Sequence, residues 1–134
     1  MPFEAQWYVD QRVVYVRQWG KLTLQDAIGT DAIIADYARQ NPDHIVHGII
    51  DSRAVEDIAI SPKALRDAFS QLPKPTEGWV VTVPGDRVSA FMTQVMAQSQ
   101  HMKQKDFTAP EAALEFLQYM DDSLIHIEVN ELSY

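Results

Sequence analysis

Two short segments in the middle of the chain, residues 45–50 and 79–83, are apolar at nearly every position. Strands of this kind are buried on both faces, as in a sheet that has helices on both sides. Polar residues follow each segment, at 51–53 and 84–87, and we predict a turn at both places. The hydrophobic pattern therefore predicts an α/β architecture whose strand ends share one rim.

The N-terminal residues predict a β-hairpin followed by a helix. Residues 3–9 alternate between apolar and polar side chains, and residues 12–19 form a second strand after a two-residue turn. Residues 20–22, which begin with a glycine, are expected to end that strand. Thr23 is a good N-cap for a helix that should run to about residue 40.

Three more helices complete the predicted order ββαβαβαβα. Ser61 and Pro62 occupy the N-cap and first helical positions that each residue favours. The last helix begins with a capping box at residues 108–111, and the lysines of residues 102–107 suit an edge strand just before it. The third helix has a predicted apolar stripe that consists of Val88, Phe91, Met92, Val95 and Met96.

The C-terminal segment predicts one additional strand. We place a domain at residues 1–122 and an extension at 123–134, in which residues 124–130 alternate between apolar and polar side chains. An isolated strand is unstable in water, so this one should add to an edge of its own sheet or to an edge of a second copy. Because two-fold dimers are the commonest oligomers, we expect a homodimer.

Composition removes several classes of function. The 134 residues carry a net charge of −8 and no cysteine, so we expect no nucleic-acid partner and no thiol chemistry. We expect no metal and no cofactor, since the histidines are scattered and no glycine-rich phosphate loop is present. The N-terminus lacks the pattern of a signal peptide and no apolar run is long enough to span a bilayer, so we expect a cytoplasmic protein.

The arrangement of these segments resembles the anti-sigma-factor-antagonist (STAS-like) fold, most closely its uncharacterised bacterial single-domain members. The likeness extends from the hairpin through the helix capped by Ser61 and the strand at 79–83 to the closing residues 107–117. It implies a mixed sheet with helices mainly on one face. It also implies a role in protein partnering, ligand sensing or, in related folds, lipid binding.

The same resemblance suggests one candidate modification site. In phosphorylated family members, a serine that follows an aspartate caps the helix after the third strand. The nearest position here is Ser61, with Ile60 where the family has the aspartate. Ser61 is thus a candidate phosphoacceptor as well as a helix cap, and a phosphate would suit the positive end of a helix.

Binding residues are expected at the rim beyond the carboxyl ends of the strands, where ligands bind in open α/β sheets. Asp51 is the principal candidate, because a carboxylate there could hold a ligand hydroxyl or a partner's arginine. It could equally accept backbone N–H groups of its own turn. Arg53 and Arg87 could pair with the neighbouring aspartates. The full set of rim candidates is Asp51, Ser52, Arg53, Ser61, Asp86 and Arg87.

Two further features have alternative interpretations. Asp31 falls within the apolar stripe of the first helix, where a buried carboxylate would need a partner or a raised pKa. Gly29 and Thr30 precede it, however, and we expect a kink there that turns Asp31 outward. Met92, Met96 and Met102 suit flexible core filling better than a ligand pocket.

These observations lead to a first hypothesis, a non-enzymatic regulatory module that binds a protein partner. The alternative is a protein that binds a small molecule or lipid in an apolar pocket under the Met-rich third helix.

Overall fold

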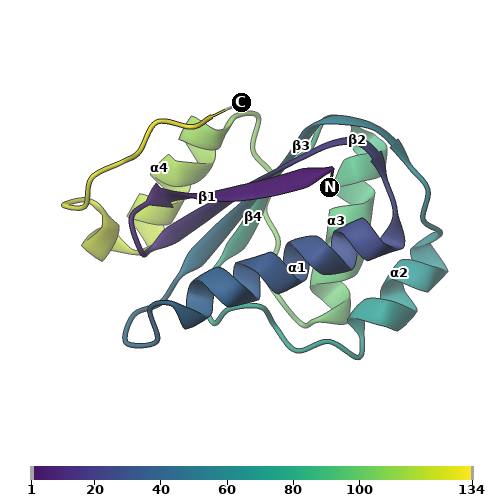
Figure 1. The fold of residues 1–134 in the computed structure, drawn as a ribbon, viewed down its shortest axis with the longest axis horizontal. Helices are drawn as coiled ribbons and strands as arrows, with labels where there is room; N and C mark the ends of the chain where they lie inside the picture. Colours follow the sequence, from purple (N-terminus) through teal and green to yellow (C-terminus); the bar gives the residue numbers. More distant parts are fainter. Residues whose placement is uncertain (1, 134) are drawn as a thin grey trace.

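A computed structural model describes residues 2–133 and contains a four-stranded mixed sheet in the order β1-β2-β3-β4 (Figure 1). β1 and β2 form the predicted antiparallel hairpin, whereas β2–β3 and β3–β4 are parallel pairs. The α/β class predicted from the sequence is therefore confirmed. The strands are β1 (Phe3–Val9), β2 (Val13–Leu22), β3 (His47–Ile58) and β4 (Val80–Val83).

Helices cover both faces of the sheet, but unequally (Figure 1). Ile49 and Ile50 are adjacent on β3 and therefore point to opposite faces. Ile50 belongs to a core with Ile34 of α1, and Ile49 belongs to a core with Leu117 of α4. α2 and α3 pack on each other and on α1, so helices lie mainly on one face, as expected. The helices are α1 (Leu24–Arg39), α2 (Pro62–Phe69), α3 (Arg87–Ser99), α4 (Pro110–Met120) and the short 3-10 helix η1 (Asp122–Leu124).

Two strands are longer than the sequence suggested. The predicted break at residues 20–22 is wrong, because β2 continues through a bulge at Gly20, whose φ of +68° suits glycine. The predicted turn at residues 51–53 is also wrong, since β3 continues to Ile58. The two extensions pair with each other, from Trp19↔Ala54 to Leu22↔Ile58. Each supplies the hydrogen-bonding partner that the other needs.

The predicted edge strand at residues 102–107 is reduced to one bridge, Thr82↔Asp106. Two backbone bonds form it, from Thr82 N–H to the Lys105 carbonyl and from Phe107 N–H to the Thr82 carbonyl. A side-chain hydrogen bond also holds the segment against β4, since the Gln104 amide donates to Thr82 Oγ1 at 2.7 Å. Met102 points into a cavity beneath α3. Side-chain contacts therefore hold this segment in place, and it does not form a continuous strand.

The predicted strand at residues 124–130 is wrong in the same way. The segment begins as η1, places Leu124 in the core with no exposed surface, and then forms a single antiparallel bridge, Val9↔Val129. The tail thus lies on the edge of its own β1, where Asn130 N–H donates to the Tyr8 carbonyl at 2.7 Å. Ile125 is 55% exposed, so the alternating pattern does not correspond to one buried face.

Helix caps follow the sequence at two of the three predicted sites. Thr23 and Asp26 form a capping box on α1, and Ser61 Oγ accepts the Ala64 N–H on α2. Thr108 does not cap α4, because the N-cap is Ala109, with no side-chain bond. No helix among the described residues has both the length and the apolar character needed to cross a membrane.

Candidate functional site

Asp51 is the centre of a buried polar cluster on the α4 face of the sheet. Its Oδ2 accepts the Tyr15 hydroxyl at 2.5 Å and the Arg53 Nη2 at 2.7 Å. Its Oδ1 accepts the Nε and the backbone N–H of Arg53, at 3.0 and 3.1 Å. The side chain thus organises its own backbone, the alternative to ligand binding, and the expected pairing with Arg53 is present.

The charges of this cluster stabilise one protonation state. Burial alone would raise the pKa of Asp51, but hydrogen bonds from Arg53 and Tyr15 outweigh it and hold that pKa below its ordinary value. Burial and the adjacent carboxylate raise the pKa of Tyr15, and the bonds to Asp51 raise that of Arg53. Asp51 is therefore a satisfied carboxylate beside an arginine whose side chain is 39% exposed.

The turn after β4 packs directly against this part of β3. A Cβ on Gly85 would lie 3.1 Å from the Arg53 carbonyl oxygen, so the close approach favours glycine. The next residue, Asp86, accepts the Ser89 N–H at 2.8 Å and caps α3. The structure thus brings Asp86 close to residues 51–53, as the rim prediction requires, while Arg87 is exposed at the start of α3.

Ser61 lies away from these residues. β3 continues from Asp51 to Ile58 before the chain reaches α2, a strand length of about 20 Å. Ser61 is exposed, and its Oγ accepts the Ala64 N–H at 3.1 Å. It sits at the accessible N-terminus of α2, where a phosphate would be favourable.

A second polar cluster was not predicted from the sequence. Asp121, just after α4, accepts hydrogen bonds from Arg12 at 3.1 Å and from His47 at 2.9 Å. His47 Nδ1 accepts the Trp79 N–H at 2.9 Å, which leaves the proton on Nε2 for Asp121. The cluster ties the starts of β2, β3 and β4 to the end of α4. Sequence spacing gives no signal of it, since its members are up to 109 residues apart.

The protonation states of this second cluster are consistent with a structural role. Burial lowers the pKa of His47, against an opposing contribution from Asp121, so the imidazole is neutral. Burial would raise the pKa of Asp121, but bonds from Ser123 and His47 hold it below its ordinary value. Within residues 2–133, no group of three or more histidine or acidic side chains is placed to hold a metal.

The predicted outward orientation of Asp31 is wrong. The side chain is buried in α1, at 9% exposure, and its Oδ1 accepts the Gln100 amide at 3.3 Å. α1 runs without interruption from Leu24 to Arg39. Gly29 has another role, because it leaves room for Phe3 of β1, whose Cζ would lie 2.6 Å from a Cβ at this position. The glycine admits an aromatic ring and does not kink the helix.

The predicted apolar stripe of α3 is only partly buried. Met92 is buried and packs with Val95 and Met96 against α1 and α2. Val88 and Phe91 instead face solvent, with 58% and 51% of their surface exposed. They form an apolar pair, one helical turn apart, on the outer surface of α3.

Comparison with known proteins finds a protein of similar fold but no relative by sequence. No family model matches the chain, and no curated protein matches it. Among solved structures, the chain is similar to the anti-sigma factor antagonist SpoIIAA in its unphosphorylated form, with a TM-score of 0.55 and 13% sequence identity. The match covers 87% of this chain and 96% of SpoIIAA. The STAS-like fold expected from the sequence is therefore confirmed.

Proposed function

We propose that the protein is a non-enzymatic regulatory module that binds a partner protein through the outer surfaces of α2 and α3. The observation that carries this proposal is the exposed pair Val88 and Phe91, because adjacent large apolar side chains on a surface are typical of interaction sites. SpoIIAA, which shares the fold, is an anti-sigma factor antagonist. That role of a protein with the same fold supports a regulatory protein partner.

The rim residues favour a role in binding over a role in catalysis. Asp51 is fully engaged by Tyr15 and Arg53, which leaves no carboxylate oxygen poised as a base. The exposed Arg87 presents positive charge at the start of α3, next to Val88. A partner with an apolar side chain flanked by acidic residues would complement this surface.

Ser61 offers a position at which such binding could be regulated. It is exposed at the N-terminus of α2, the helix that packs against α3. A phosphate there would add negative charge to the α2 part of the proposed surface. We therefore keep Ser61 as the candidate phosphoacceptor, with helix capping as its function in the unmodified protein.

The test is an affinity capture from the native host with matched surface variants. Phe91→Asp should abolish capture of the partner without changing the melting temperature, since the side chain is already half exposed. Tyr119→Asp is the control, because Tyr119 is 84% exposed on α4, on the other face of the sheet. Equal capture by both variants and the unmodified protein would refute the proposed surface.

A further inference from the structure

Two small adjoining cavities lie between α3 and the sheet, on the inner side of the helix whose outer side carries Val88 and Phe91. Their volumes are about 30 and 20 Å³, and both are lined by Ile50, Thr93 and Met96. A water molecule occupies about 10–15 Å³ on this scale, so each cavity holds only a few atoms. Met96 lines both cavities, and methionine side chains adapt readily to what they pack against.

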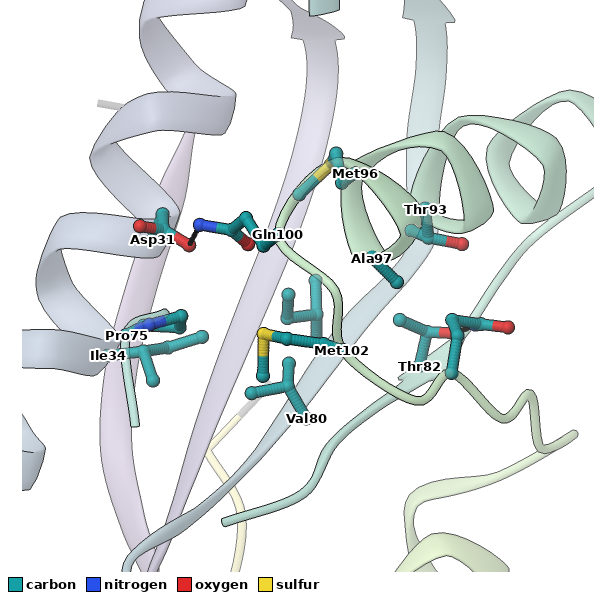
Figure 2. A pocket seen from close by; sticks show the side chains of 12 residues that line it. Asp31, Ile34, Pro75, Val80, Thr82, Thr93, Met96, Ala97, Gln100 and Met102 are labelled. Atoms are coloured by element: carbon teal, nitrogen blue, oxygen red, sulfur yellow. Dashed lines mark hydrogen bonds between the residues drawn. The ribbon is translucent and has the colours of Figure 1, made fainter. Parts of the chain in front are cut away.

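The larger cavity contains a carboxyl group that lacks a cationic partner. Figure 2 shows Asp31 of α1 and Gln100, which follows α3, meeting on one side of this cavity. Asp31 is the only ionisable residue among the described residues that line it. Gln100 divides its amide between Asp31 at 3.3 Å and the Pro73 carbonyl at 3.1 Å, so its bond to the carboxyl is long.

The smaller cavity contains a buried hydroxyl group that makes no hydrogen bond within the described part of the chain. Ser52 is 3% exposed and lines this cavity, and its Oγ has no hydrogen-bond partner among the described residues. Buried polar atoms in folded proteins are nearly always paired. The remaining walls are largely aliphatic and methionine side chains, so the joined space is apolar with a carboxyl group at one end and a hydroxyl group at the other.

We propose that this joined cavity binds a small aliphatic amine, with its ammonium group on the carboxylate of Asp31 and its alkyl chain beneath Met96. A buried carboxylate is stable when it is paired with a cation, as Asp51 is with Arg53 in the same protein. Burial raises the pKa of Asp31 to about 6, so the carboxylate is still available at neutral pH. An alkyl chain suits the walls, and displacement of Met96 gives it room.

The experiment is an NMR titration of the full chain with n-butylamine near neutral pH. Amide shifts should change around Asp31, Thr93 and Gln100, and Asp31→Asn should weaken binding about tenfold, because a charge-assisted bond is lost. Asp36→Asn is the control on the same helix, since Asp36 is exposed and pairs with Arg39. It should leave the affinity unchanged.

Two more measurements make the result decisive. n-Butanol and butyrate, which match the alkyl chain but lack the cation, should each bind at least about tenfold more weakly than the amine. Met96→Ala should strengthen amine binding by enlarging the joined cavity. Equal affinities of the amine and the alcohol, equal affinities of the Asp31→Asn and unmodified proteins, or no shifts around the cavity would each overturn the proposal. None of these results depends on the partner surface of α2 and α3.

Discussion

Each face of the sheet buries an aspartate, and the pKa values of the two carboxyl groups are shifted in opposite directions. On the α4 face, Asp51 accepts bonds from Tyr15 and Arg53, and its pKa lies below the ordinary value. On the α1 face, Asp31 accepts one long bond from Gln100, and burial raises its pKa to about 6. The first carboxylate stabilises the fold and the second opposes it. A buried charge without a cationic partner is costly, and strongly perturbed pKa values cluster at functional sites.

The segments that cover the two faces of the sheet also differ in how tightly they pack. On the α4 face the tail adds Leu124 to the core, and Ile127 and Leu132 pack against it. On the other face, α3 stands over two cavities lined by methionine. We infer that the α4 face is the more rigid and the α3 face the more adaptable, because cavities and methionine side chains permit repacking.

The largest expected effect comes from removing the tail. Deletion of residues 123–134 should reduce the free energy of unfolding by about 3 kcal/mol, because Leu124 is fully buried, while the domain stays folded. Light scattering of the full chain and of the deletion variant tests the predicted homodimer, in which the tail would pair with the β1 edge of a second copy instead of its own. A full-length protein that is monomeric at high micromolar concentration would restrict the tail to its own β1.

Asp51→Ala should be the most damaging substitution on the α4 face. It leaves Tyr15 and Arg53 without their acceptor, and we expect a loss of about 2 kcal/mol in urea unfolding. Asp86→Ala removes only a helix cap and should cost about 1 kcal/mol. Equal, small shifts in both variants would contradict the structural role of the Asp51 cluster.

Asp31→Asn should have the opposite sign. The folded-state pKa of about 6 exceeds the ordinary 3.8, so the folded state binds the proton more tightly. The stabilising contribution of the protonated group is complete below pH 3.8 and is lost as the pH rises through 6. At pH 7 the asparagine variant should therefore be more stable by about 2 kcal/mol, and the advantage should vanish near pH 4. Unfolding curves across this range test the sign, and an advantage that does not change with pH would contradict the assignment.

Ser61→Ala should have the smallest effect. Loss of the cap on α2 should cost about 1 kcal/mol, while capture of the partner by the unphosphorylated protein stays intact. Thermal unfolding and affinity capture measure the two consequences separately. If the substitution abolished capture at an unchanged melting temperature, Ser61 would act through phosphorylation and not through capping.

Much of the fold and part of the candidate site are predictable from local sequence. The hairpin, the helix capped by Thr23 and the helix capped by Ser61 depend on side-chain alternation and on bonds within four residues, which the sequence states directly. The apolar segments at 45–50 and 79–83 indicate burial on both faces for the same reason. Asp51, Ser52 and Arg53 could be selected as a group because they follow such a segment.

The tertiary structure decided everything that depends on a partner distant in the sequence. β3 continues past Asp51 because the end of β2 pairs with it, and the predicted strand at 124–130 is reduced to a single bridge to β1, Val9↔Val129. Asp31 is buried because α1 packs on the sheet and Gln100, which follows α3, contacts its carboxyl group. The cluster of Arg12, His47 and Asp121 forms only when the chain is folded. Periodicity determines which residues form an element, whereas pairing and packing across the sheet determine where that element ends and which charges it buries.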